Sequence, residues 1–127
     1  MTPKVKLTTF TKLIAWQRSH ELVIGVLESC EKMQKIDVLK SQLERSAISI
    51  TSNIAEGFGR QTNKDKKHFY VMARGSAYEL QNQLLIARDM KKITELEFQE
   101  LARQSLDSVR LIHGLIRSIL KSEYPSS

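Results

Sequence analysis

The sequence predicts an all-α protein, an antiparallel up-down-up-down four-helix bundle, and three observations support this fold class. The two prolines, Pro3 and Pro125, stand at the ends of the 127-residue chain, so no proline between them interrupts a helix. Four stretches carry apolar residues at steps of three and four, which places them on one face of a helix. Short linkers with helix-capping residues separate these stretches, and short linkers make consecutive helices antiparallel.

The first two helices are expected between residues 13 and 57. The first apolar stripe comprises Leu13, Trp16, His20, Val23, Leu27 and Cys30, and the second comprises Leu39, Leu43, Ala47, Ile50 and Ile54. Asp37 precedes the second stripe, where its carboxylate can accept hydrogen bonds from free amides of the first turn. Gly57 or Gly59 is expected to end this helix in the left-handed conformation that glycine tolerates.

The third helix is expected to run from the cap residue Thr62 to about Lys91, and the fourth to begin after Thr94. Asp65 takes the place of the Glu in a capping box with Thr62, whereas Thr94 and Glu97 form a complete one. The two stripes comprise Phe69, Ala73, Ala77, Leu80, Leu84 and Ala87, then Phe98, Ala102, Ser105, Val109, Ile112, Ile116 and Ile119. We expect one bundle domain, residues 12–121, between a basic N-terminal tail (1–11) and a C-terminal tail (122–127).

Composition limits the kind of protein. The chain has 20 Lys and Arg against 14 Asp and Glu, a formal charge of +6. Its single cysteine, Cys30, excludes an intramolecular disulfide and a zinc site built on two or more thiolates. The apolar run after the basic start is too short for a signal peptide or a membrane span. These features predict a cytoplasmic protein that does not contact a membrane.

The sequence carries no pattern typical of an active site. A di-metal centre in a bundle needs Glu-x-x-His on two helices, and the three histidines are preceded at that spacing by Gln17, Asp65 and Arg110. Phosphate-loop and nucleophile-elbow motifs are absent. Cys30 and His20 are ten residues apart on one helix, about 15 Å, too far for a nucleophile and its base. We therefore predict no enzymatic activity, no metal and no cofactor.

The predicted topology gathers positive charge at one end of the bundle, where the N-terminus, the second linker and the C-terminus meet. The start of the third helix adds free amides that attract anions. The candidate nucleic-acid-binding residues are Arg60, Lys64, Lys66, Lys67 and Tyr70. The alternatives are that the charges only solvate a loop and that aromatic rings at this end only close the core.

The same topology predicts two ion pairs between the second and third helices. Antiparallel pairing about a turn near residue 61 sets Arg45 opposite Glu79 and Glu56 opposite His68. Either pair could be a catalytic couple, but charges of this kind more often fix the register of two helices. We interpret both as structural ion pairs.

The central sequence resembles a known family. The matching residues are Gln42-Leu43, Arg45-Ser46-Ala47, Ser49-Ile50, Asn53-Ile54-Ala55-Glu56-Gly57, Gly75-Ser76 and Glu79. They resemble the four-helix bundle family encoded in intervening sequences of bacterial 23S ribosomal RNA genes, which is similar to accessory proteins of diversity-generating retroelements. The resemblance extends from about residue 12 to 120. It implies a homo-oligomer, a pentamer, with a role in nucleic-acid binding and no catalytic activity.

Two functions follow as hypotheses. The first is an oligomeric bundle that binds RNA, or nucleic acid generally, through phosphate contacts at its basic end. The second is an adaptor that docks an acidic protein partner and has no nucleic-acid role. Self-association also has a basis in the residues, because two helices carry apolar residues beyond one core stripe: Ile14, Leu22, Ile24 and Val26, then Leu106, Leu111, Leu115 and Leu120. The alternative is a wide stripe that faces the protein's own core.

Overall fold

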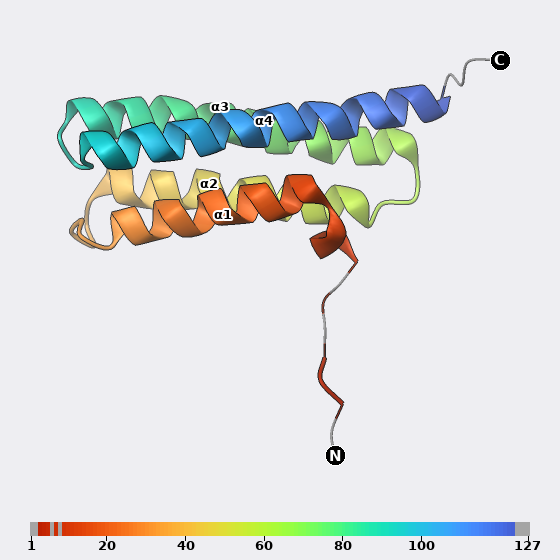
Figure 1. The fold of residues 1–127 in the computed structure, drawn as a ribbon, viewed down its shortest axis with the longest axis horizontal. Helices are drawn as coiled ribbons and strands as arrows, with labels where there is room; N and C mark the ends of the chain where they lie inside the picture. The colour runs from red at the N-terminus through yellow and green to blue at the C-terminus, as the bar shows by residue number, and fades with distance from the viewer. Residues whose placement is uncertain (1–2, 6, 8, 124–127) are drawn as a thin grey trace.

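Four long helices make up the fold. The computed structural model describes residues 3–5, 7 and 9–123, except the side chains of residues 122 and 123. A 3-10 turn, η1 (Phe10–Lys12), precedes the helices α1 (Ile14–Cys30), α2 (Val38–Phe58), α3 (Asn63–Asp89) and α4 (Glu95–Glu123), and the described residues contain no strand. Consecutive helices run in opposite directions (Figure 1), which confirms the predicted bundle. Residues 124–127 of the predicted C-terminal tail lie outside the described residues.

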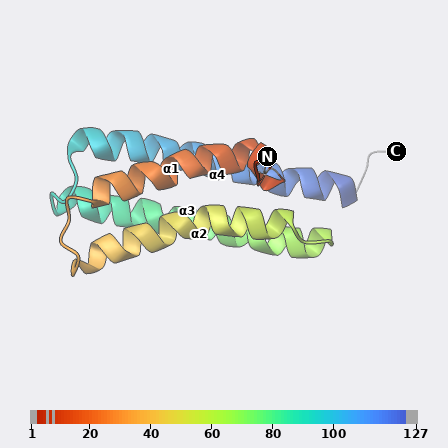
Figure 2. The same cartoon turned by 90° about the horizontal axis from the view of Figure 1, so that it is seen from below.

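Each helix packs against two neighbours. α1 lies between α2 and α4, and α3 lies between the same two helices on the other side, as the view from below shows (Figure 2). The linkers α1–α2 and α3–α4 lie at one end of the bundle, and the α2–α3 turn and the end of α4 lie at the other (Figure 1). The basic linker and the C-terminal cations of α4 therefore share one end, as predicted.

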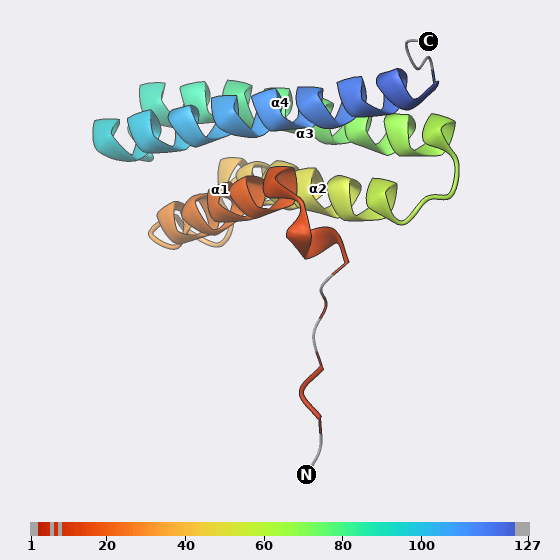
Figure 3. The ribbon, with the colours of Figure 1, turned by 45° about the vertical axis from the view of Figure 1, so that its right-hand side comes forward.

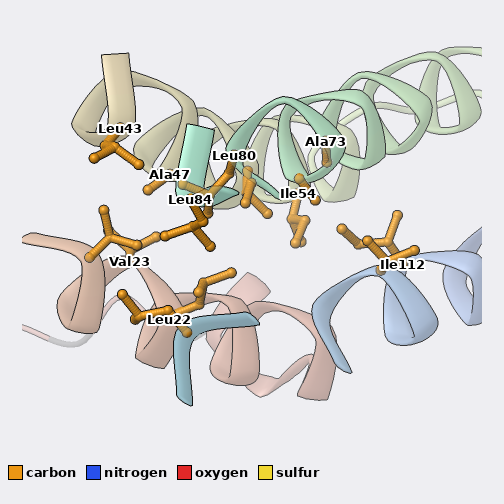
Figure 4. Packing of buried hydrophobic residues seen from close by; sticks show 14 of the residues in the cluster. Leu22, Val23, Leu43, Ala47, Ile54, Ala73, Leu80, Leu84 and Ile112 are labelled. Carbon is orange, nitrogen blue, oxygen red and sulfur yellow. The ribbon is translucent and has the colours of Figure 1, made fainter. Parts of the chain in front are cut away.

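The core runs along the bundle axis (Figure 4). Its fully buried large residues include Leu22, Leu43, Ile50, Ile54, Leu80, Leu84 and Ile112. Ala47 of α2 and Ala73 and Ala77 of α3 are also fully buried, and residues this small let two helices approach closely. The apolar stripes predicted for these helices are thus the ones that the core uses.

The buried face of α1 is only partly the predicted one. Val23 and Cys30 of the predicted stripe are buried, and so are Ala15, Ser19, Leu22 and Val26, whereas the predicted core residue His20 is exposed. The His20 ring stacks on Trp16, with 4.6 Å between centroids. Ser19 of α1 hydrogen-bonds with Ser108 of α4 over 2.6 Å between their hydroxyl oxygens, so two buried polar groups satisfy each other. The spacing of apolar residues could not predict that Ser19 lies in the core, because serine is not apolar.

The predicted helix starts are confirmed. The amide of Leu39 donates to Asp37 Oδ1 (2.9 Å) and the amide of Asp65 donates to Thr62 Oγ1 (3.1 Å). The complete capping box is present at α4, where the Glu97 amide donates to Thr94 Oγ1 (3.1 Å) and the Thr94 amide donates to Glu97 Oε1 (2.8 Å).

Two ion pairs join the α1–α2 linker region to the α3–α4 linker region, at the end of the bundle opposite the α2–α3 turn. Lys92 Nζ lies 3.1 Å from Asp37 Oδ2, and its hydrogen bond lowers the pKa of that carboxyl. Lys32 pairs with Glu97. Burial opposes ionisation of Glu97, but hydrogen bonds from Lys32 and Thr94 hold its pKa at about 2. Lys92 of the α3–α4 linker therefore holds the cap of α2, and Lys32 of the α1–α2 linker holds the cap of α4.

The predicted glycine end of α2 is wrong in its backbone geometry. Gly59 follows the last helical residue with a φ of −78°, and no glycine among the described residues has a positive φ. Lys91 at the end of α3 has a φ of 58° instead. The Lys92 amide donates to Ala87 O (2.8 Å) and the Lys91 amide to Arg88 O (3.0 Å), which is the Schellman arrangement that favours glycine.

We expect Lys91→Gly to raise the free energy of unfolding by about 1 kcal/mol, because a side chain in the left-handed region costs about 1–2 kcal/mol. Chemical denaturation measures the change. The control is Met90→Gly, which places glycine at the neighbouring exposed residue, whose φ of −85° does not require it. A loss of stability in Lys91→Gly would show that the lysine side chain contributes more than its backbone conformation costs.

Candidate nucleic-acid interface

The predicted basic residues lie around the α2–α3 turn, residues 59–62, but they have different environments. Arg60 is exposed, and its guanidinium lies 2.5 Å from Glu56 Oε1 of the preceding helical turn. The same guanidinium stacks 4.5 Å above the Phe69 ring. Arg60 is thus held by an acid and an aromatic ring of its own chain, which leaves it less available to a ligand.

Lys66 stabilises the end of α2. Its Nζ donates to the backbone oxygen of Phe58 (2.7 Å) and lies 5.4 Å from the Phe58 ring centroid. The last carbonyls of a helix have no partner within the helix, so the ammonium supplies one. Lys66 is half-buried in this position, and its role in the fold is structural.

Tyr70 does not fit its predicted role in stacking on bases. Its side chain is only 4% exposed and belongs to the core. The ring packs over Gly57, where a Cβ atom would lie 2.8 Å from Tyr70 Cε1. Burial also raises the pKa of the Tyr70 hydroxyl. Tyr70 faces inward because the missing side chain at Gly57 leaves room for its ring between α2 and α3.

Lys64 and Lys67 are exposed on the first turns of α3. Neither takes part in an ion pair within the part of the chain that the structure describes. Of the residues predicted to bind nucleic acid, these two are therefore the ones whose charge is available to a phosphate.

The structure adds cations that the sequence analysis did not select. Arg74 Nη1 of α3 lies 3.2 Å from His113 Nδ1 of α4, which fixes the register of the two helices here. Lys67 precedes Arg74 by two helical turns and so lies on the same face. Arg117 and Lys121 follow His113 at helical spacing, and both are exposed. We call the set Lys64, Lys67, Arg74, Arg117 and Lys121 the basic face.

Apart from Lys64, which Asp65 follows directly, the cations of the basic face lie on helical segments without carboxylates. Residues 66–78 and residues 108–122 include no Asp or Glu. Gly114, Arg117, Ser118 and Lys121 line a shallow hollow of about 260 Å³ on the surface of α4. A signal for this face was present in the sequence, because two acid-free segments with several cations belong to adjacent antiparallel helices.

The sequence matches the family model of the 23S rRNA-intervening sequence proteins over residues 11–114. The chain belongs to this family. A solved structure, a protein of unknown function from the S23 ribosomal protein family of Bacteroides thetaiotaomicron, is similar with a TM-score of 0.75 and 23% identity. The similarity covers 81% of this chain and 98% of that protein, and it shows the shared fold. No functionally curated protein matches the sequence.

The ion pairs of this family member differ from prediction at one of two places. Arg45 pairs with Glu79 across α2 and α3 as expected. Glu79 also accepts a hydrogen bond from Gln83 Nε2 (3.3 Å), and Gln83 Oε1 accepts one from the buried Ser46 (2.6 Å). The pair therefore continues into a polar network between the helices, which supports its role in register.

The predicted pair between Glu56 and His68 is wrong. Glu56 pairs with Arg60, four residues later in the chain. The His68 ring packs edge-on against Phe69, with 5.1 Å between centroids. Arg60 follows Glu56 by one helical turn and pairs with its carboxylate. His68 belongs to the helix on the other side of the α2–α3 turn.

The described residues contain no cluster of three or more His, Cys, Asp or Glu able to hold a metal ion. Cys30 is buried in the core, and burial raises the pKa of its thiol to about 11, which disfavours the reactive thiolate. The family and its structural neighbour are of unknown function, and neither indicates an enzymatic activity. Within the described ranges, no helix is both long and apolar enough to cross a membrane.

Proposed function

We propose that this protein is a non-enzymatic bundle that binds RNA, or nucleic acid generally, through its basic face. The observation that carries the proposal is that Lys67, Arg74, Arg117 and Lys121 lie on adjacent segments of α3 and α4 without carboxylates, with Lys64 at the start of α3. Lysine and arginine bind phosphates by charge, and such contacts supply most of the affinity of sequence-independent binding. The name of the family, which refers to 23S ribosomal RNA, is consistent with an RNA ligand.

The mode of binding that we propose uses phosphates and little base recognition. Tyr70 is buried and Phe58 and Phe69 are half-buried against Lys66 and Arg60, so the ring faces near the turn are partly covered. The free amides at the start of α3 add a further attraction for phosphate. Binding of this kind depends on the backbone of the nucleic acid and not on its sequence.

We also propose that the protein forms a homo-oligomer, the pentamer that its family resemblance implies. Of the residues that suggested self-association, Ile14, Ile24, Leu106 and Leu120 are exposed, while Leu22 and Val26 lie in the protein's own core and Leu111 and Leu115 pack against it. Exposed apolar residues favour cover by another chain. A closed ring would place one basic face per subunit around a common axis and so strengthen weak phosphate contacts.

A salt titration tests the proposed function. We expect binding to a structured RNA hairpin to weaken steeply with salt, because each phosphate contact contributes about −0.7 to −0.9 to the slope of log K against log salt concentration. A slope of about −3.5 to −4.5, from fluorescence anisotropy, would fit the five cations of the basic face. Heparin should displace the RNA.

The competing function is an adaptor for an acidic protein partner. In that case neither RNA nor DNA would bind at low salt, although the basic face would still be needed by the partner. Absence of binding to both nucleic acids at 50 mM salt would therefore reject the proposed function in favour of this alternative.

A further inference from the structure

The groove between α1 and α4 differs in charge from the rest of this basic protein. It is a hollow of about 580 Å³, within the range of pockets that hold ligands. Residues from both helices line it, and they include no Lys or Arg. Its rim and floor are formed by Glu21, Glu28, Glu97 and Glu100, with Ile24 and Leu101.

Three of the four carboxylates of the groove are available to a cationic occupant, whereas Glu97 is already held by Lys32. Glu28 takes part in no ion pair within the described ranges of the chain. Glu21 lies 3.7 Å from Arg18, and Glu100 lies 2.6 Å from Arg103; all four side chains are more than half exposed. Exposed pairs of this kind contribute little energy, so an incoming cation can compete for the acids. A groove with this charge repels the phosphates that the basic face attracts.

The apolar floor results from a close approach of α1 and α4. A Cβ atom at Gly25 would lie 2.9 Å from Leu101 Cδ2, so only glycine fits without movement. The side-chain oxygen of Gln104 is buried beside Gly25 and accepts no hydrogen bond within the described structure. A hydrogen-bond donor delivered to the floor would find this acceptor free. The groove thus suits a segment that is apolar, basic and rich in donors.

The chain's own N-terminal arm, residues 3–9, has this chemistry. Val5 is 90% exposed and Leu7 is 76% exposed, so neither is covered by its own bundle. The sequence alternates as Lys4-Val5-Lys6-Leu7, and alternation in an extended chain puts the two apolar residues on one side and the two lysines on the other. With the apolar side on the groove floor, the lysine side chains start on the opposite side of the arm, and their flexible four-carbon stems are long enough to bend to the glutamates of the rim.

The dimensions also agree. The groove follows α1 from His20 to Ser29, about 14 Å at 1.5 Å per residue. About four residue steps of extended chain, at about 3.3 Å each, cover this length. The alternating stretch, residues 4–7, provides three of these steps, and the whole arm, residues 3–9, provides six, so the arm is long enough to occupy the groove.

The described residues of the arm, 3–5, 7 and 9, do not lie over the groove of their own molecule. They lie on the side of α1 and α2, away from α3 and α4 (Figures 1 and 3). Thr11 Oγ1 donates to the backbone oxygen of Leu7 (3.0 Å), and Gln17 Nε2 donates to the backbone oxygen of Thr11 (2.9 Å). These hydrogen bonds hold the start of the arm in its outward direction.

We infer that the N-terminal arm of one copy docks in the α1–α4 groove of a neighbouring copy, with Val5 and Leu7 on the apolar floor and the lysines against the glutamates. The contact is head-to-tail, because arm and groove are different surfaces, and contacts of this kind close into rings when the rotation permits. This inference rests on the proposed self-association and supplies an interface for it.

Cross-linking between two cysteine variants tests the inference. One preparation carries Val5→Cys, and the other carries Ile24→Cys and a mass tag. Cys30 is buried, and its raised pKa keeps it unreactive. Under mild oxidation the mixture should give a disulfide-linked heterodimer on a non-reducing gel. Ile86→Cys on α3 replaces Ile24→Cys as the control, because Ile86 is 43% exposed and Ile24 is 40% exposed.

A second variant keeps the arm but removes its apolar side. Val5→Asp with Leu7→Asp should raise the dissociation constant of the assembly at least tenfold by sedimentation velocity, with helicity unchanged. A disulfide within one chain of Val5→Cys with Ile24→Cys, without a dimer, would show that the arm folds onto its own groove and would overturn the inference. Equal cross-linking of Ile24→Cys and Ile86→Cys would also overturn it.

The outcome separates the inference from the proposed function. An assembly that persists without the Val5-to-Ile24 disulfide rejects the arm but leaves self-association in place. A wild-type monomer at micromolar concentration by light scattering rejects both the proposed assembly and the arm. RNA binding by a single subunit depends on its basic face, so neither of these results changes what is expected for it.

Discussion

Reversing three cations of the basic face, Lys67→Glu, Arg117→Glu and Lys121→Glu, is expected to weaken binding to an RNA hairpin at least about 100-fold. Each hydrogen bond to a charged group contributes about 1.5–3 kcal/mol, and a glutamate at the same place repels phosphate. The three side chains are exposed, so helicity and the unfolding midpoint should stay close to those of the parent. Fluorescence anisotropy at low salt measures the loss.

The matched control changes the charge at the opposite end of the bundle. Lys35→Glu, Lys91→Glu, Gln34→Glu and Ser41→Glu together change the net charge by the same amount, from +6 to zero, and all four side chains are exposed. Lys92 is kept, because it pairs with Asp37 at the cap of α2. If charge acts through the basic face, this variant retains most of the affinity. Equal losses in the two variants would show that RNA responds to the total charge of the protein.

Lys66 is left out of the reversal although the sequence suggested it. Its ammonium caps the carbonyl of Phe58, and Lys66→Glu would bring a carboxylate to the negative end of the α2 dipole. Loss of RNA binding in that variant could reflect a frayed helix. The structure therefore replaces it with Arg117 and Lys121, which make no such contact.

Features that depend on a few neighbouring residues could be predicted from the sequence. The caps at Asp37, Thr62 and Thr94 each need a side-chain oxygen and an amide within three residues, so a short stretch of sequence determines them. The pair of Arg45 and Glu79 needed only the antiparallel topology and the position of the turn. The antiparallel topology itself was predicted from the short linkers between the helices.

The orientation of the aromatic residues at the start of α3 could not be predicted in the same way. Phe69 precedes the core residue Ala73 by four positions and Tyr70 precedes it by three, so both fit a helical stripe. Gly57 of the neighbouring helix decides between them, since its missing side chain admits the Tyr70 ring. Periodicity along one helix contains no information about space left by another.

The basic face was missed in part for a related reason. Arg74 and Arg117 are more than 40 residues apart in the sequence, and the contact of Arg74 with His113 sets the two segments side by side. Counting charges near the linkers found Lys64 and Lys67 but not the cations along the helices. An absence of acids in two segments was the available signal.

Gly57→Ala is expected to destabilise the protein by about 1–2 kcal/mol, although alanine is the better helix former by about 1 kcal/mol. The new Cβ would lie 2.8 Å from Cε1 and 2.9 Å from Cδ1 of Tyr70, and 3.1 Å from Phe69 Cβ. Tyr70 is buried and cannot rotate away without leaving a cavity, and overpacking of this kind costs about 1–3 kcal/mol. Thermal and urea unfolding measure the change.

Gly75 provides the matched control, because it lies on α3 with no atom within 4 Å of a built Cβ. There the same substitution should stabilise the protein by about 0.5–1 kcal/mol through helix propensity alone. A double variant identifies the cause of the loss at Gly57. With Tyr70→Leu, which removes the ring atoms that clash, Gly57→Ala should cost less than it does alone, and this non-additivity is the mark of a direct contact. Additive effects would place the strain in the α2 backbone instead.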